Sequence, residues 1–307
     1  MNHLAYFGFK EEPFRMTPDR DFYFPSTNQT AISEVIRFGL AQGEGFIIVI
    51  GEVGTGKTML LRFLTGDLTE KYDTALLLSP HFTPKELLLA ILRDIESIEL
   101  SSEKDYSLDD LLRILNDFLY ELARNDRRLL VIIDEAQNLP EESIEQLRLL
   151  SNFESDKQKL LQIILVGQPE LRAKLEKPKL RQFLQRVSIL ETLNPLSKNE
   201  TILYVHFRLR IAGNEHLRLS NSARNHLWIA TRGVPRMINK IMSRALLVAY
   251  AQQKKKHIDS AVINEAVNML KFTHHSRPWW NPILSWKVTA VVMLLSLTGL
   301  LTLLSYV

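Results

Sequence analysis

Residues 51–58 read "GEVGTGKT" and follow the apolar run "FIIVI" at 46–50. The stretch fits the pattern G-x-x-x-x-G-K-[ST], in the required context of a preceding strand and a following helix. Glycines let such a loop wrap around an anion without Cβ clashes, and its N–H groups and the helix N-terminus then face the phosphates. A glycine-rich turn with a surface lysine is the alternative, and this context disfavours it. The stretch therefore predicts a loop that holds the phosphates of ATP.

Two side chains of this loop have distinct predicted roles. Lys57 would reach the β- and γ-phosphates, and the Thr58 hydroxyl would bind Mg²⁺. The residues predicted to contact the nucleotide are Gly51, Glu52, Val53, Gly54, Thr55, Gly56, Lys57, Thr58 and Met59.

The run "LLVIIDEAQ" at 129–137 supplies a second part of the site. A strand with this sequence places Asp134 and Glu135 at its carboxyl end, where open α/β sheets bind their ligands. Asp134 is predicted to hold Mg²⁺, and Glu135 to polarise the attacking water as a general base. Two acids at a strand end also fit surface polarity, but together with the phosphate loop they favour hydrolysis. A small-molecule kinase would not need a base for water at this position.

Four further residues have two interpretations each. Gln168 follows the run "IILVG" and either orients the lytic water or caps the strand end. Arg236 in "TRGVPR" either closes a helical domain onto the nucleotide or forms a surface salt bridge. Arg181 and Arg186 in "LRQFLQRV" either reach the nucleotide of a neighbouring subunit or form a basic, solvated helix end. Because arginine suits a helix C-terminus, the local pattern favours the second interpretation of that pair.

Short apolar runs alternate with amphipathic helical patterns along the first two thirds of the chain. This alternation predicts an α/β fold in which a parallel sheet is covered by helices on both faces. After "LNPLSK" the strand patterns stop and only helical patterns follow. We therefore predict an α/β nucleotide-binding domain over 1–195, an all-helical lid domain over 196–270 and a linker over 271–287.

The composition excludes several classes of protein. The 307 residues contain no cysteine, which excludes disulfides, thiolate catalysis and Cys-ligated zinc. The net charge of +3 is too small to indicate a nucleic-acid partner. The start "MNHLAYFGFKEEPF" lacks a basic segment followed by an apolar one, so we expect that the bulk of the chain is not exported.

A series of stretches follow one another along the chain: "HLAYFGFKEEPFRMTPDRDFYFPS", "GEGFIIVIGEVGTGKT", "VIIDEAQNLP", "LRLLSNFE", "VGQPEL", "LRQFLQRV" and "RGVPRMIN". In this order they resemble the AAA+ ATPases of bacterial secretion and pilus assembly. These are the general secretion pathway protein A group and the MSHA pilus biogenesis ATPases, of which the second is the more similar. The resemblance covers residues 3–270, and "EEPFRMTPD" joined to "DEAQNLP" and "GQPEL" is its most specific part.

The resemblance implies a P-loop AAA+ fold and a role for each matching residue. It makes Lys57 and Thr58 the Walker A pair, and it makes the two acids after the run at 129–133 the Walker B pair. Gln168 takes the sensor 1 position and Arg236 the sensor 2 position. The resemblance also implies ATP and Mg²⁺ as ligands and nucleotide-dependent homo-oligomers in the form of a ring.

The resemblance makes Arg186 the preferred arginine finger, the residue that acts on a neighbouring subunit's nucleotide. Many relatives read "LRQLRQR" where this chain has "LRQFLQR", so Leu184 replaces a basic residue. This departure weakens the idea that several arginines act together. For residues 13–25 no mechanism follows from the motif, and we expect them to pack near the adenine.

Residues 288–307, "VTAVVMLLSLTGLLTLLSYV", contain no charged side chain. At about 1.5 Å per residue they would form a helix of about 30 Å, which matches the hydrocarbon thickness of a bilayer. Trp279, Trp280 and Trp286 lie just before the stretch, as interface anchors do, and Lys287 marks its cytoplasmic side. A core or dimerisation helix would normally keep one polar stripe. We predict a single transmembrane helix in the inner membrane, with the ATPase domain in the cytoplasm.

Three functions remain open at this point. The first is a membrane-anchored ATPase that assembles or positions a secretion or type IV, MSHA-like pilus complex, with membrane-embedded assembly proteins as partners. The second is a DNA-associated ATPase related to transposition helper proteins, which the predicted membrane span disfavours. The third is a non-hydrolysing scaffold, which Glu135 disfavours. Secretion-type relatives carry a cell-wall-binding domain beyond their span, and we expect none here unless the chain is truncated.

Overall fold

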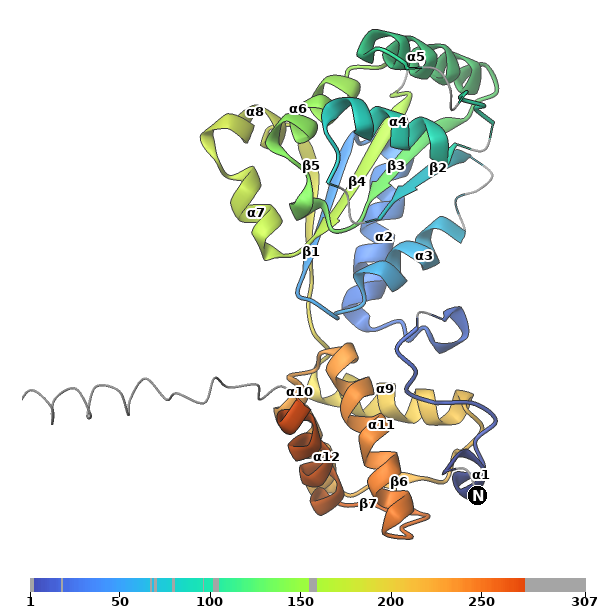
Figure 1. The fold of residues 1–307 in the computed structure, drawn as a ribbon, viewed down its shortest axis with the longest axis vertical. Coiled ribbons are helices and arrows are strands. Elements are labelled where there is room, and N and C mark those ends of the chain that lie inside the picture. The colour runs from blue at the N-terminus through green and yellow to red at the C-terminus, as the bar shows by residue number, and fades with distance from the viewer. Residues whose placement is uncertain are drawn as a thin grey trace, which may run out of the picture.

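The computed structural model describes residues 3–273, except residues 18, 67, 69–70, 79–80, 96, 102–104 and 155–158. Figure 1 shows a sheet flanked by helices and, below the sheet in this view, a second region made mainly of helices. The first region is called the sheet region below and the second the helical region.

The sheet has five strands in the order β2-β3-β4-β1-β5. The strands are β1 (Phe46–Gly51), β2 (Tyr72–Leu77), β3 (Arg128–Ile133), β4 (Leu161–Gly167) and β5 (Val187–Leu193). All four neighbouring pairs are parallel, so all five carboxyl ends lie at one edge. This confirms the predicted parallel α/β sheet and places the phosphate loop after β1 beside the acids after β3.

Helices cover both faces of the sheet (Figure 1). Along β1, Ile47 and Val49 pack in one cluster with α2 and α3, whereas Ile48 and Ile50 pack in a second cluster with the other helices. The strand is buried along its whole length, as its unbroken apolar sequence predicts. The helices of this region are α2 (Thr27–Gln42), α3 (Lys57–Gly66), α4 (Pro84–Asp94), α5 (Leu108–Arg124), α6 (Glu141–Leu150), α7 (Pro169–Leu175) and α8 (Arg181–Leu184), with the short turns η2 (Ala136–Asn138) and η3 (Pro178–Leu180).

The helical region contains α9 (Lys198–Ile211), α10 (Asn221–Thr231), α11 (Pro235–Ala251) and α12 (Ser260–Thr273). It also contains a two-stranded parallel pair, β6 (Arg218–Leu219) and β7 (His257–Ile258). The prediction of helices alone is therefore wrong at these two short segments. Leu219 and Ile258 are buried in the core of the region, and their ladder satisfies the backbone groups that go with them.

The N-terminal segment contributes to the core of the helical region. It contains α1 (His3–Phe7) and η1 (Arg20–Phe22). Phe7, Phe9, Phe14 and Phe22 are all buried in one cluster with side chains of α9 to α12. The predicted boundaries at 195 and 270 stay predictions, but these four rings connect the first 22 residues to the second core rather than to the sheet.

Backbone groups take part in the contacts between the two regions. The Arg236 N–H, at the start of α11, donates to the Gly54 carbonyl of the phosphate loop at 3.2 Å. The Thr27 N–H, at the start of α2, donates to the carboxylate of Glu200, which also caps α9. These contacts hold the phosphate loop and the start of α2 against the helical region.

None of the helices in the described residues is long and apolar enough to cross a membrane. The predicted transmembrane helix at 288–307 and most of the predicted linker at 271–287 lie outside those residues.

Candidate active site

The phosphate loop runs from the end of β1 into the first turn of α3. Gly54 and Gly56 have φ angles of 83° and 102°, in the left-handed region that favours glycine. A Cβ on Gly54 would lie 2.5 Å from the Arg236 Cβ, so a glycine here also permits the contact between the loop and α11. Both roles agree with the glycine pattern of "GEVGTGKT".

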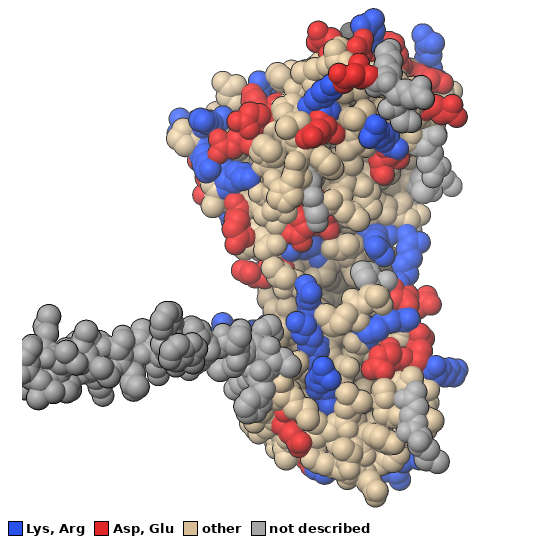
Figure 2. Space-filling view, viewed as in Figure 1, with Lys and Arg blue, Asp and Glu red and all other residues tan. Residues whose placement is uncertain are grey.

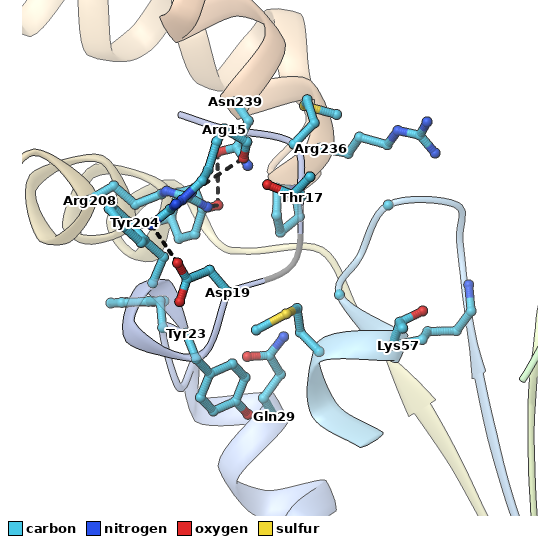
Figure 3. Close-up of a pocket in the computed structure, with 18 of the residues that line it drawn as sticks. Arg15, Thr17, Asp19, Tyr23, Gln29, Lys57, Tyr204, Arg208, Arg236 and Asn239 are labelled. Carbon is cyan, nitrogen blue, oxygen red and sulfur yellow. Dashed lines mark hydrogen bonds and ion pairs between the residues drawn. The ribbon is translucent and has the colours of Figure 1, made fainter. Parts of the chain in front are cut away.

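The Lys57 side chain lies inside this loop (Figure 3). Its residue is only 5% exposed, and its ammonium donates to the carbonyls of Gly51 at 2.8 Å and Glu52 at 3.1 Å. Burial lowers the pKa of Lys57, although the nearby carboxylates of Glu135 and Asp134 oppose that shift. The structure therefore surrounds one ammonium with loop carbonyls at the end of β1.

The Thr58 hydroxyl donates to the Asp134 carboxylate at 2.6 Å, which brings together the two predicted Mg²⁺ ligands. Mg²⁺ prefers oxygen ligands and usually keeps several waters beside one or two carboxylates and substrate phosphates. Within the described residues no group of three or more His, Asp or Glu side chains could hold a metal ion by itself. The pair fits a Mg²⁺ ion that is shared with a nucleotide rather than enclosed by protein.

Glu135 follows Asp134 in a left-handed conformation, with φ of 54°. Its carboxylate oxygen Oε2 accepts hydrogen bonds from the side-chain amides of Gln168, at 2.8 Å, and Gln137, at 2.5 Å. Burial would raise the pKa of Glu135, but these two amides and the Lys57 charge outweigh it, so that the pKa is lowered. The carboxylate is therefore ionised at neutral pH and has two fixed donors.

A cavity of about 380 Å³ joins the phosphate loop to the helical region and the N-terminal segment. Figure 3 shows side chains from all three parts converging on it. The predicted nucleotide-binding residues that line it are Val53, Gly54, Gly56, Lys57, Thr58 and Met59, together with Glu135 and Arg236. Gly51, Glu52 and Thr55 do not line the cavity but stabilise the loop, because their groups bond Lys57 or each other.

The far side of the cavity contains residues of the N-terminal segment, among them Arg15, Thr17 and Tyr23. A buried arginine, Arg208 of α9, fixes this segment: its Nε donates to the Pro13 carbonyl at 2.6 Å. Its other nitrogens donate to the Tyr204 hydroxyl at 2.8 Å and to the Arg15 carbonyl at 3.4 Å.

Two guanidinium groups lie over the Phe22 ring in the same part of the structure. Those of Arg15 and Arg208 are each 4.7 Å from the ring centroid. Tyr204 donates in turn to Asn239 of α11 at 2.8 Å, and Asn239 also lines the cavity. The N-terminal segment is thus held on the helical region as one wall of the cavity.

Of the remaining predicted residues, Gln168 lies next to Glu135, whereas Arg181 and Arg186 lie outside the cavity. Gln168 directly precedes α7, where its side chain makes no capping bond, and its amide donates to Glu135 instead; its sensor role stays a prediction. Arg181 and Arg186 do not line the cavity of their own chain. The Arg186 guanidinium instead bonds Ser151 at 2.9 Å and Asn152 at 2.5 Å, just beyond α6.

Several site residues were not predicted from the sequence. Gln137 and Arg208 are the most important, followed by Gln29, whose amide approaches the loop at the Thr55 carbonyl. Gln137 lies only two residues after Glu135, within "DEAQ", and a search for polar side chains next to the acids would have found it. Arg208 lies 193 residues after Arg15, and no local pattern connects them.

Residues 40–175 match the family described as AAA domain. The chain contains an AAA domain. The chain is also 38% identical to General secretion pathway protein A of Aeromonas hydrophila. The match extends over 254 residues, or 83% of this chain. The predicted resemblance to that group is therefore confirmed. The chain spans only 46% of the length of this relative.

Solved structures show the same P-loop AAA+ fold. The ORC2 protein of Aeropyrum pernix, in ADPNP–ADP complexes, matches with a TM-score of 0.62 at 19% identity, over 85% of this chain and 72% of that one. The RuvB Holliday junction branch migration motor of Thermotoga maritima matches with a TM-score of 0.53 at 17% identity, over 84% of this chain and 73% of that one. At these identities the likeness is one of fold.

Proposed function

We propose that the AAA domain binds and hydrolyses ATP. The observation that carries the proposal is one cavity lined by Lys57, Thr58 and the ionised Glu135, with Asp134 hydrogen-bonded to Thr58 directly behind it. Thr58 and Asp134 would hold Mg²⁺, which supplies neutralising charge at the phosphate oxygens when it is bound. The loop N–H groups and Lys57 would bind the phosphates, and Glu135 would take the proton from the attacking water.

The opposite end of the same cavity would hold the base. Tyr23, Met16 and the aromatic Phe22 offer an apolar surface beside polar groups of the N-terminal segment and α11. Cofactor and substrate sites combine mostly apolar walls with a few placed polar groups in this way. This supports the expectation that residues 13–25 pack near the adenine, and it gives Arg208 the role of holding them there.

Arg236 would connect nucleotide binding to movement of the helical region. Its side chain lines the cavity, and its backbone N–H bonds the loop carbonyl of Gly54 at 3.2 Å. A γ-phosphate that attracts the guanidinium would therefore bias the position of α11 against α3. We propose that Arg186, or else Arg181, acts on the nucleotide of a neighbouring subunit in a homo-oligomeric ring.

The test is phosphate release by the full chain with ATP and Mg²⁺, measured over a range of protein concentrations. Turnover per chain should rise with concentration if a neighbour completes the site, and Lys57→Ala should abolish it. An arginine finger contributes about 10³–10⁵ in rate, so Arg186→Ala should remove the concentration dependence. ATP that binds without any turnover at any concentration would contradict hydrolysis and favour the scaffold function.

We further propose that the ATPase works at the inner membrane, anchored by residues 288–307, on a secretion or pilus assembly complex. The support is the similarity to General secretion pathway protein A and the uncharged tail of the sequence. Glu135→Gln should accumulate the ATP-bound form, so cross-linking this variant in membranes should recover membrane-embedded assembly proteins. Recovery of the variant from the soluble fraction would contradict the anchor.

A DNA-associated function is the second candidate, because the solved structures of this fold include the Aeropyrum pernix ORC1 protein in complex with DNA. On the face shown in Figure 2, basic and acidic side chains are interspersed over both regions, without a continuous basic surface. A DNA-binding protein loses affinity steeply as salt is raised, since it releases counterions. We expect no such salt-dependent binding of duplex DNA by the full chain.

A further inference from the structure

Gln137 connects the two catalytic motifs through both ends of its side chain. Its Nε2 donates to Glu135 Oε2 at 2.5 Å, and its Oε1 accepts from the backbone N–H of Gln168 at 3.1 Å. The Gln168 side chain closes the ring by donating to the same Glu135 oxygen at 2.8 Å. Because one end of the amide must donate and the other must accept, this arrangement fixes its orientation.

The surroundings of Gln137 are shaped to hold it. A Cβ on Gly167 would lie 2.9 Å from the Gln137 Oε1 and 2.8 Å from Leu171, so a larger residue at 167 would displace the amide. Lys174 of α7 donates to the backbone carbonyls of Gln137 at 2.5 Å and Leu139 at 2.7 Å. The turn after β3 is thereby attached to α7, the helix that follows Gln168.

We propose that Gln137 is a positioning residue for Glu135, and that it holds the carboxylate for proton transfer by occupying one of its oxygens. Both amide donors bond Oε2, and within the described residues Oε1 accepts no hydrogen bond. Oε1 is then the oxygen that receives the proton from water. This inference rests on the proposed hydrolysis and explains why "DEAQ" and "VGQ" occur together in one chain.

Leucine and glutamate in place of Gln137 would disturb this hydrogen-bond arrangement in different ways. Leucine fills a similar volume but neither donates to Glu135 nor accepts from the Gln168 N–H. Glutamate accepts from that N–H but lacks the amide donor, and it places a like charge beside Glu135 that would displace the carboxylate. Gln137→Glu should therefore lower kcat at least as much as Gln137→Leu does.

The experiment compares full-length wild type, Gln137→Leu and Gln137→Glu by ATP affinity, kcat and KM. The Kd for ATP should stay within about twofold, because Gln137 does not line the nucleotide cavity. The kcat should fall about 10–100-fold, as expected for the loss of a hydrogen bond to a charged group. A purely structural role would not lower kcat in both variants while leaving the ATP Kd and KM in place.

Gln162→Leu is the matched control. Gln162 is a fully buried glutamine in β4 whose amide donates to the carbonyls of Leu40 and Glu44, away from the cavity. Its replacement should lower the melting temperature and leave kcat unchanged. Equal kcat in an active wild type and both Gln137 variants would overturn the positioning role. An inactive wild type that binds ATP would instead contradict the proposed hydrolysis.

Discussion

The two ends of the nucleotide cavity are built in different ways. At the phosphate end, Lys57 and Thr58 come from one loop, and Glu135 and Gln168 come from the ends of two neighbouring strands. At the base end, a buried arginine of α9 bonds carbonyls nearly two hundred residues earlier in the chain. The first end consists of short motifs that the sheet brings together, whereas the second depends on the packing of an isolated side chain against a distant segment.

This difference has a functional consequence. The phosphate end is fixed by strands that are buried on both faces, so its geometry should be the same whether or not the helical region moves. The base end belongs to the core of the helical region, and any motion of that region against the sheet changes the shape of the cavity. Substitutions at the first end should therefore change chemistry, and substitutions at the second should change affinity.

Among the substitutions that separate the two ends of the cavity, Glu135→Gln should give the largest effect. The variant keeps the volume and the polar contacts of the side chain but removes the general base, which typically contributes 10²–10⁴-fold to the rate. We expect kcat to fall by about that factor, with the ATP Kd within about twofold of wild type, by phosphate release and equilibrium binding. A fall in affinity as large as the fall in kcat would contradict the division between the two ends.

Arg208→Leu tests the base end. The change leaves the Pro13 carbonyl and the Tyr204 hydroxyl without their donor, so the free energy of unfolding should fall by about 2–3 kcal/mol. The ATP Kd should rise, while kcat at saturating ATP should stay close to wild type. Arg210→Leu, at an exposed position on the same helix, is the control and should change neither quantity. A loss confined to kcat would show that Arg208 acts at the phosphate end instead.

The features of the fold and site that could be predicted are those encoded in short runs of sequence. Strand and loop periodicity predicted the parallel sheet, and the spacing of "GEVGTGKT" and "IIDEAQ" predicted the loop, the Thr58–Asp134 pair and Glu135. Each motif is a short run of residues, and the parallel sheet brings the ends of the two runs together although Thr58 and Asp134 are 76 residues apart. Arg208 could not be predicted, since a buried arginine looks like any basic residue of an amphipathic helix until its acceptors are known. The β6–β7 pair was missed because two-residue strands are too short for a periodic signal.

Gly54→Ala tests the contact where the two regions meet. A Cβ at this position would lie 2.5 Å from the Arg236 Cβ, and φ is 83°. The left-handed conformation costs a non-glycine residue about 1–2 kcal/mol of stability, and the clash with Arg236 would in addition displace the phosphate loop, so ATP affinity should fall about tenfold. Gly43→Ala is the matched control, because Gly43 has φ of 80° at the end of α2 but nothing near its Cβ. It should lower stability with unchanged affinity, and equal affinity losses in both variants would refute the contact.

We expect the smallest effect from a substitution of His206, and we expect it to change only the stability of the helical region. Burial first, and then the charges of Arg218 and Arg224, lower the pKa of His206. In the unfolded chain the imidazole takes up its proton near pH 6.5, and in the folded chain only at lower pH, so the unfolded state binds more protons between those values. Stability from this group is therefore complete above pH 6.5 and is lost as pH falls toward the lowered pKa. His206→Gln should flatten that part of the pH–stability curve, measured by denaturant unfolding, without moving the pH dependence of kcat. A shift in the pH dependence of kcat would instead show that protonation of His206 in α9 affects Glu135. The two ends of the cavity would then be coupled more tightly than their separate cores suggest.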